Sequence, residues 1–393
     1  MKILMINVVC GIRSTGRICT DLAGKLEKEG HTVMIAYGRE FLPPEYARYS
    51  YRIASDYEVR LDALKSRLFD NAGFNNVRAT KRFIRWIREY DPDVIHMHNI
   101  HGYYLNVGIL FDYLKTCGKR IIWTMHDCWP FTGHSALCDG IGCEKWTSGC
   151  SSCPQISEYP KALIDRSSRN WVLKRKTFGG VPRLTVVTPS RWLADKVRKS
   201  FLSEYNVEVI PNGINTEIFC HRDSDLRARY GIEAKKVLLS AATTWNDLKG
   251  YQDFMKLSAM LGPEYVIVLV GVSKKQFNEL PDNIIGIRRT ADLEEMAKWY
   301  STADLYINLT YCDTYPTVNV ESVACGTPVI TYRTGGSVES MFGFGKVVPK
   351  GDIFEVVSVI KGYNNASDDH IVVPTKKLDK NYYLDKYLEL ILG

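Results

Sequence analysis

The residues best suited to chemistry lie between Tyr311 and Gly336, a segment rich in acidic, hydroxyl and small side chains. Asp313 and Glu321 are separated by seven residues. Thr317, which follows a proline, predicts the N-cap of a helix, and Gly326 predicts its end. One carboxylate then lies in the loop before the helix and the other in its first turn. Carboxylates accept hydrogen bonds from sugar hydroxyls, and free N–H groups at a helix N-terminus bind phosphate. The segment therefore predicts a site for a phosphorylated sugar; the alternative is that Glu321 only complements the helix dipole.

A second polar turn, at 11–17, follows the first apolar run of the chain. It precedes a helical pattern, so its backbone N–H groups are expected to meet a phosphate or sugar oxygen. The spacing differs from G-x-G-x-x-G, and the acidic residue expected about 20 residues later is absent. A dinucleotide site is therefore not expected.

Three histidines, His96, His98 and His101, lie near the predicted end of a strand. His96 and His98 share one face of that strand, which is compatible with a metal site. We favour the alternative, in which the histidines hydrogen-bond sugar hydroxyls. Tyr103, just after them, is expected either to stack on a sugar ring or to pack in the core.

Five of the eleven cysteines lie between Cys128 and Cys153, with the spacing C-x9-C-x4-C-x6-C-x2-C. In a cytosolic chain the last four form a set of thiolates suited to tetrahedral zinc. They are Cys138, Cys143, Cys150 and Cys153. Reduced thiols packed in a loop and disulfides are the two alternatives. Four thiolates leave no open coordination position, so a zinc ion here would be structural.

The elements that position these residues alternate between apolar strands and amphipathic helices, as in α/β proteins with parallel sheets covered by helices. Strands are expected at 3–9, 32–36, 94–98, 120–126, 184–187 and 207–210 in the first half, and at 237–241, 265–270, 284–287, 305–309 and 329–332 in the second. Helices are expected between them, for example at 251–261 and 293–301. This alternation predicts two doubly wound halves, which bind ligands at the carboxyl ends of their strands.

The turn 211–213 predicts the hinge between the halves. We expect an N-terminal domain at 1–212 that includes the cysteine-rich loop 128–153, and a C-terminal domain at 213–380. A final helix at 381–393 is expected to pack back toward the N-terminal domain.

The composition, with 45% hydrophobic and 24% charged residues in 393, excludes disorder, collagen and coiled coil. No run approaches the roughly 18 apolar residues of a membrane-spanning helix. The N-terminal apolar run lacks a small-residue cleavage site, so a cytosolic protein is expected.

The net charge of +7 is concentrated in the first half. Basic residues are frequent from Arg166 to Lys199, where they alternate with aromatic and aliphatic residues. This pattern predicts either a solvated helix face or attraction to an anionic membrane surface or a phosphorylated acceptor. Nucleic acid is not expected, because no recognised nucleic-acid module is present.

The motif around Asp313 and Glu321 resembles the E-x7-E region of glycosyltransferase family 4, which also carries the A-C-G-T-P-V-I and T-G-G segments found at 324–330 and 334–336. The resemblance covers nearly the whole chain. It includes the glycine loop within 1–38, His126-Asp127, the segments 188–190 and 211–214, and Lys249-Gly250. Segments 99–104 and 129–134 are similar to the branch that builds bacterial capsular, exopolysaccharide and O-antigen chains. The resemblance implies a GT-B fold, in which two Rossmann-like domains face each other across a deep cleft.

The resemblance also implies roles for individual residues. The catalytic group would be His126, Asp313, Lys249 and Glu321, in which Glu321 holds the nucleotide ribose and Lys249 the diphosphate. Donor contacts would come from Gly16, Arg17, Thr244, Lys249, Arg288, Asp313, Thr317, Val318, Asn319 and Glu321. Acceptor contacts would come from Ser14, Thr15, Asn99, His101, Tyr103 and Trp129. The loop 14–17 would close over the phosphates.

Two positions depart from the family pattern. Asp313 stands where the family has Glu, and the arginine that usually precedes the lysine is missing from 243–248. Arg288 or Arg289 is the candidate replacement for that charge.

The function implied is a retaining, metal-independent transfer of a hexose from a nucleotide diphosphate sugar to a lipid-linked saccharide at the inner face of the plasma membrane. The alternatives are a catalytically impaired sugar-binding or assembly protein, and a nucleotide-sugar epimerase on the same fold.

Overall fold

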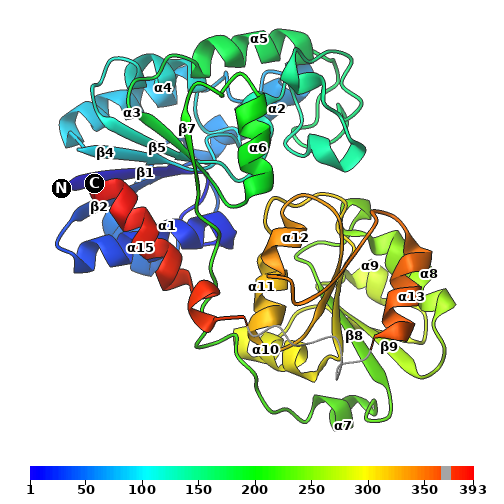
Figure 1. Ribbon diagram of the computed structural model, residues 1–393. Coiled ribbons are helices and arrows are strands. Elements are labelled where there is room, and N and C mark those ends of the chain that lie inside the picture. The colour runs from blue at the N-terminus through cyan, green and yellow to red at the C-terminus, as the bar shows by residue number, and fades with distance from the viewer. Residues whose placement is uncertain (364–372) are drawn as a thin grey trace. The chain divides into compact units, whose positions relative to one another are not determined.

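The computed structural model describes residues 1–363 and 373–393, and for Cys138 the backbone alone. The chain divides into two units, which are described separately (Figure 1). Unit 1 contains Met1–Ile210 together with Leu384–Gly393, and unit 2 contains Pro211–Tyr383. Within the described residues, no helix combines the length and apolar composition needed to cross a bilayer.

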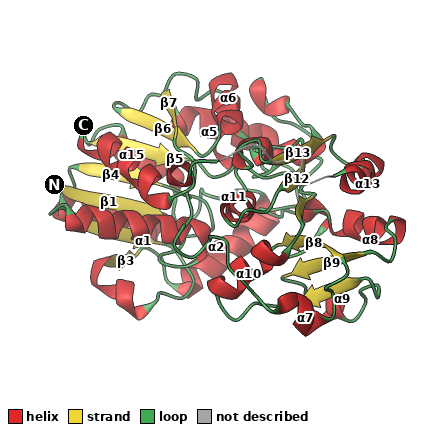
Figure 2. Cartoon of the chain, turned by 60° about the horizontal axis from the view of Figure 1, so that its bottom comes forward, coloured by secondary structure: helices red, strands yellow, loops and turns green. Residues whose placement is uncertain are grey.

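Unit 1 is built on a seven-stranded parallel sheet with the order β3-β2-β1-β4-β5-β6-β7. Its strands are β1 (Lys2–Asn7), β2 (Thr32–Tyr37), β3 (Ser50–Arg52), β4 (Val94–Met97), β5 (Arg120–Thr124), β6 (Leu184–Thr188) and β7 (Asn206–Val209). The central strand β1 pairs with β2 and β4, with Ile3 opposite Val33 on one side and Val94 on the other. Figure 2 shows the strands β1, β4, β5, β6 and β7 side by side.

Helices cover both faces of this sheet because its strands are apolar on both sides. The helices of unit 1 are α1 (Arg13–Lys28), α2 (Asp56–Phe69), α3 (Val77–Tyr90), α4 (Val107–Leu114), α5 (Ser167–Phe178) and α6 (Arg191–Lys199). Leu4 and Ile6 of β1 pack in one core with Phe83 of α3 and Phe111 of α4.

The last helix of the chain, α15 (Lys380–Leu392), ends in unit 1. The Thr124 hydroxyl donates a hydrogen bond to the Tyr387 hydroxyl over 3.2 Å, and Ile391 is fully buried. The end of α15 is thus part of the packing of unit 1.

Unit 2 is built on a six-stranded parallel sheet with the order β10-β9-β8-β11-β12-β13. Its strands are β8 (Lys236–Ala241), β9 (Tyr265–Val270), β10 (Ile284–Ile287), β11 (Leu305–Asn308), β12 (Val329–Tyr332) and β13 (Gly345–Val348). Its helices are α7 (Leu226–Tyr230), α8 (Tyr251–Met260), α9 (Lys274–Phe277), α10 (Leu293–Thr302), α11 (Thr317–Ala324), α12 (Ser337–Ser340) and α13 (Ile353–Gly362).

The predicted α/β class and the two parallel, doubly wound sheets are confirmed. Two edge strands, β3 and β13, were not predicted, because each is short and lacks a continuous apolar run. The polar turn 14–17 was predicted as a loop, which is wrong: α1 begins at Arg13, so these residues form its first turn.

The basic segment from Arg166 to Lys199 is divided among α5, β6 and α6. Lys174 is fully buried, and its ammonium group donates to the carbonyl oxygens of Trp129 and Thr132 at 2.7 and 3.0 Å. Lys174 is therefore not available to a membrane, and docking by the exposed basic residues of the segment stays a prediction.

Candidate active site

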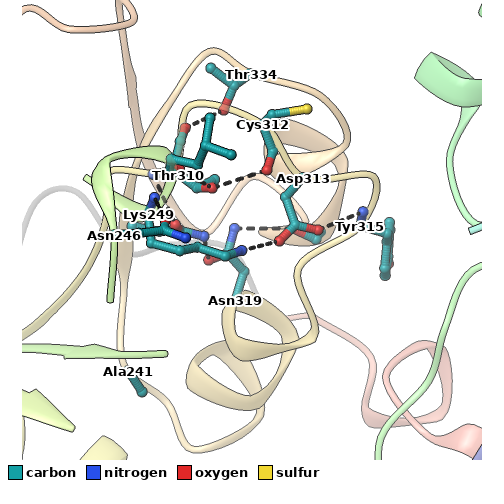
Figure 3. Close-up of polar contacts among 12 residues, drawn as sticks. Ala241, Asn246, Lys249, Thr310, Cys312, Asp313, Tyr315, Asn319 and Thr334 are labelled. Atoms are coloured by element: carbon teal, nitrogen blue, oxygen red, sulfur yellow. Dashed lines mark hydrogen bonds and ion pairs between the residues drawn. The ribbon is translucent and has the colours of Figure 1, made fainter. Parts of the chain in front are cut away.

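A lysine and an aspartate form an ion pair at the carboxyl edge of the unit 2 sheet (Figure 3). Lys249 ends the short 3-10 helix Asp247–Lys249 that follows β8, and the Asn246 side chain caps this helix by accepting from the Lys249 N–H. Asp313 lies in the loop between β11 and α11. The Lys249 ammonium donates to the Asp313 carboxylate over 2.7 Å. Burial opposes the charged form of Lys249, but the neighbouring carboxylate raises its pKa above the usual value.

Close backbone packing fixes the positions of these two side chains. Gly250 has a φ of +73°, and a Cβ there would lie 2.3 Å from the Leu309 carbonyl oxygen. Gly335 has a φ of +51°, and a Cβ there would lie 1.8 Å from the Asp313 carbonyl oxygen. Glycine is required at both positions. The K-G and T-G-G motifs therefore bring the Lys249 and Asp313 loops together.

Glu321 is held by a tyrosine that the sequence did not indicate. The Tyr300 hydroxyl, fully buried at the end of α10, donates to the Glu321 carboxylate over 2.9 Å. Burial and the nearby Glu321 raise the pKa of Tyr300 well above its usual value, so the tyrosine remains a proton donor. A hydrogen bond to a charged acceptor fixes the orientation of that carboxylate.

The start of α11 differs from the prediction. Its N-cap is Pro316 without a side-chain cap, and Thr317 is the first helical residue. Glu321 therefore lies in the second turn, so neither its predicted place in the first turn nor a simple helix-dipole role holds. Gly326 follows the end of the helix with a φ of +84°, as predicted.

The first turn of α11 offers backbone rather than side-chain donors. The Asn319 side chain is buried and bonded within unit 2, to Asn308 at 2.7 Å and to Ser340 at 3.0 Å. A contact from this side chain to a ligand is therefore excluded in this conformation. Thr317 and Val318 are partly exposed, and N–H groups in a first turn have no acceptor within the helix. These N–H groups are suited to an anion.

Two other predicted donor residues, Thr244 and Arg288, and the alternative Arg289 make no hydrogen bond or ion pair with this cluster in the described part of the chain. Thr244 is exposed in the loop after β8, and Arg288 and Arg289 are exposed after β10. Within the part of the chain that the structure describes, neither arginine forms an ion pair with Asp313. An arginine that serves the donor phosphates need not contact Asp313, so the replacement of the missing charge by Arg288 or Arg289 stays a prediction.

Unit 1 places a row of histidines at the carboxyl ends of β4 and β5. His98 Nδ1 and His126 Nε2 are 3.1 Å apart, and His96 Nε2 is 2.9 Å from the Thr124 hydroxyl. Burial lowers the pKa of His126 to about 4 and that of His96 to about 3. All three rings are therefore neutral at pH 7, and His126 is suited to hydrogen bonding rather than to carrying charge. His96 and His98 are fully buried and contact Thr124 and His126, so the predicted hydrogen bonds to sugar hydroxyls stay a prediction.

A second array next to this row links His101 to the H-D pair. His101 Nε2 is 2.7 Å from the Asp127 carboxylate, and its Nδ1 is 3.1 Å from the Tyr159 hydroxyl. Burial opposes ionisation of Asp127, but His101 and the Trp129 N–H hold its pKa below the usual range. Sequence spacing could not reveal this array, because its members lie far apart in the chain, in the connections that follow β4 and β5.

The predicted acceptor residues are only partly available. Trp129 is buried, with the Lys174 ammonium 3.6 Å from the centre of its ring, so its ring is not available for the predicted acceptor contact in this conformation. Tyr103 is half-buried, with a φ of +69°, and its ring lies edge-on to that of Tyr159. Asn99 is half-buried, and its N–H donates to the Asn7 side chain.

The first turn of α1 holds the remaining predicted contacts. Ser14 and Arg17 are exposed, whereas Gly16 is buried. The Thr15 hydroxyl accepts from the Asn7 side chain at 3.3 Å. Ser14 and Arg17 are thus accessible to a ligand, from a helix rather than from a mobile loop.

In the cysteine-rich loop 128–153, three of the four predicted zinc ligands have described side chains. These are Cys143, Cys150 and Cys153, and all three are free thiols. The Gly133 N–H donates to Cys150 Sγ at 3.2 Å, and burial raises the pKa of Cys150 to about 11. Among the described residues, no three or more His, Cys, Asp or Glu side chains form a group that could hold a metal ion. The side chain of Cys138, the fourth predicted ligand, lies outside the described residues. Zinc binding therefore stays a prediction.

Sequence comparisons match both halves of the chain to glycosyltransferases. Residues 15–218 match glycosyltransferase family 4, and residues 235–361 match glycosyl transferases group 1. The Escherichia coli K12 protein WcaC, which bears the name of a colanic acid biosynthesis glycosyl transferase, is 26% identical over 92% of this chain and 90% of its own.

Solved structures share the fold. Anabaena HepE in complex with UDP has a TM-score of 0.69 at 13% identity, over 100% of both chains. Sucrose-phosphate synthase from Thermosynechococcus elongatus has a TM-score of 0.67 at 17% identity, over 99% of this chain and 94% of its own. The fold is GT-B, and the chain belongs to glycosyltransferase family 4.

Proposed function

We propose that this chain is a retaining glycosyltransferase that moves a hexose from a nucleotide diphosphate sugar to a lipid-linked saccharide during the synthesis of a surface polysaccharide. The observation that carries the proposal is the unit 2 cluster: Lys249 paired with Asp313, Glu321 oriented by Tyr300, and the N–H groups of Thr317 and Val318 at the start of α11. The likeness to WcaC supports the polysaccharide context, and the UDP complex of HepE supports a nucleotide donor.

The chemistry requires stabilisation of the departing diphosphate. The bond between the sugar C1 and the diphosphate oxygen breaks with oxocarbenium character, and a bond from C1 to the acceptor oxygen forms. The Lys249 ammonium and the N–H groups of Thr317 and Val318 are the groups suited to the charge that develops on the diphosphate. Glu321, fixed by Tyr300, is suited to accept from ribose hydroxyls.

The ion pair with Asp313 has a consequence for donor binding. The Lys249 ammonium has three N–H donors, and one of them donates to Asp313. The remaining donors are available for a phosphate oxygen. Asp313 would then orient the lysine and lie beside the sugar. The same pair also favours the alternative of a sugar-binding protein without turnover, because it partly neutralises the charge that the leaving group needs.

In unit 1, neutral His126 would accept from or donate to a hydroxyl of the transferred sugar, without becoming charged. His101, Tyr103 and Asn99, with Ser14 and Thr15, would contact the acceptor. The Lys249 ammonium and the N–H groups can stabilise the diphosphate, so we expect turnover without divalent ions. We place the reaction at the cytosolic face of the membrane.

A screen of UDP-, GDP- and dTDP-sugars tests the proposal. Release of nucleoside diphosphate that increases with a lipid-linked acceptor, in the presence of EDTA, is expected with one donor. NMR of the product should show that the anomeric configuration is retained. Tight binding of a donor with neither hydrolysis nor transfer would refute enzymatic activity in favour of the binding protein. Conversion of the donor to an epimer would favour an epimerase.

A further inference from the structure

The helix α2 exposes most of its large apolar side chains to solvent, whereas its two fully buried residues are polar. Asp62 and Ser66 are its buried residues, at 1% and 2% exposure, and Asp70 directly after it is equally buried. The exposed face carries Tyr57 (74%), Leu61 (37%), Leu64 (54%), Leu68 (39%) and Phe69 (45%). Most of these lie three or four residues apart, so they form one stripe along the helix.

Hydrogen bonds fix the helix in this orientation. Asp62 accepts from the side chains of Asn75 and Asn76 at 2.9 Å each, and Asn76 also donates to the Tyr103 carbonyl oxygen. Asp70 accepts from His134 Nδ1 at 2.6 Å. Rotating the helix to bury its leucines would leave these buried polar groups without partners, at considerable cost. The exposed stripe is therefore a property of the fold of unit 1.

The loop 161–166 extends the stripe. The Leu163 N–H donates to the Arg67 carbonyl oxygen at 2.8 Å, which places exposed Leu163 (67%) and Ile164 beside the end of α2. The Arg166 guanidinium lies 5.7 Å from the centre of the Phe69 ring. We call the set Tyr57, Leu61, Leu64, Leu68, Phe69, Leu163 and Ile164 the α2 surface.

Basic side chains border this surface. Arg60, Lys65 and Arg67 are exposed on the same helix, and Lys161 is exposed in the adjoining loop. The acidic residue Glu58 is paired with Arg82 at 2.8 Å, and Asp56 with Arg52. Asp165 of the same loop is exposed as well, so basic side chains outnumber acidic ones around the α2 surface.

We propose that the α2 surface docks unit 1 on an anionic lipid bilayer, an inference that rests on the proposed transfer to a lipid-linked acceptor. Long aliphatic side chains in a row, bordered by lysine and arginine, match a lipid interface with acidic headgroups. A second copy of this chain is a poorer occupant, because two such faces would bring their basic rims together. The Asn76 side chain donates hydrogen bonds to Asp62 of α2 and to the carbonyl oxygen of Tyr103, a predicted acceptor residue. The helix that carries the α2 surface is therefore connected to that residue.

Vesicle sedimentation of the full chain, without donor, tests the proposal. The probes are vesicles of phosphatidylcholine alone and of phosphatidylcholine with about one quarter phosphatidylglycerol. Wild type is expected to sediment with the anionic vesicles, and less so at high salt. The double variant Leu64→Asp/Leu68→Asp should bind at least about tenfold more weakly, because it removes two inserted side chains and adds repulsive charge. Both positions are exposed, so the fold should be retained, as circular dichroism can check.

Phe354→Asp is the control, because Phe354 is an apolar residue even more exposed (74%) than Leu64 (54%) and Leu68 (39%), but it lies on α13 in unit 2. It should sediment like wild type. Lack of sedimentation of the wild type, or equal sedimentation of wild type and the double variant, would overturn the proposal. So would a wild-type dimer that the double variant converts to a monomer, since a second copy would then occupy the surface. Release of nucleoside diphosphate from the donor with a detergent-dispersed lipid-linked acceptor tests the proposed function separately. No release by the wild type with any of the donors would refute that function, whereas the double variant is expected to release as much as the wild type.

Discussion

The hydrogen bond from Tyr300 to Glu321 offers the sharpest test of the unit 2 cluster. Tyr300→Phe removes one hydroxyl from a fully buried ring and leaves the packing of the ring unchanged. A hydrogen bond to a charged group contributes about 1.5–3 kcal/mol. If roughly half of that contribution serves to orient Glu321 toward the ribose, donor binding loses about 0.75–1.5 kcal/mol, or about four- to twelvefold in KM. We expect little change in kcat, because the bond acts on binding rather than on the leaving group.

Tyr332→Phe is the matched control for this substitution. Tyr332 is also fully buried in unit 2, and its hydroxyl donates to the Asp253 carboxylate over the same 2.9 Å. Asp253 also accepts from Tyr311 at 2.8 Å, and it is not among the predicted ligand contacts. Both variants should lower the free energy of unfolding by a similar amount, about 1–3 kcal/mol. Only Tyr300→Phe should raise the donor KM.

Steady-state kinetics with the best donor, together with denaturant unfolding of each variant, measure both quantities. A donor KM that is unchanged in Tyr300→Phe, despite a loss of stability like that of the control, would refute the assignment of Glu321 to the ribose. An equal rise in KM in both variants would show that the effect is a general consequence of destabilising unit 2.

Three further predictions concern single sites. Lys249→Ala and Glu321→Gln should each lower kcat/KM by about tenfold or more, about 1.4 kcal/mol, with an unchanged circular dichroism spectrum, and full activity of both variants would contradict the donor assignment. Purified protein prepared without chelators should contain about one zinc ion per chain that Cys150→Ser loses, and metal analysis without zinc would contradict this. Asp127 has a lowered pKa in the folded protein, so its charged form stabilises the fold. That stability is present above the usual aspartate pKa of about 3.9 and is lost as the pH falls through the lowered value. Asp127→Asn should therefore be less stable than wild type at pH 7 by about 1–3 kcal/mol. That difference should shrink as the pH falls below about 4, and a difference that is constant from pH 7 to pH 3 would contradict the role of the carboxylate charge.

The sequence predicted the fold well because apolar runs on both faces of a strand are characteristic of parallel sheets covered by helices. It also predicted the loops of Lys249 and Asp313, since glycines required by close backbone approach leave a visible signature. It did not predict that the two side chains would pair, or that Tyr300 would hold Glu321, because these contacts join elements far apart in the chain. Trp129 was misassigned for a related reason: an aromatic residue after a strand is equally compatible with a ligand platform and with a buried ring beneath a lysine.

The helix α2 shows why periodicity alone cannot decide which face of a helix is buried. Leu61, Leu64 and Leu68 repeat with helical spacing, and so do Asp62 and Ser66 on the opposite side. Each set is a continuous stripe, and an average soluble helix would bury the leucines. The outcome depends on the partners that the rest of unit 1 provides, which here are amide groups from the following loop and a histidine from a distant one. These partners keep Asp62 and Ser66 buried and leave the leucines exposed. An apolar face that the sequence alone would assign to the core is therefore a solvent-exposed surface of unit 1.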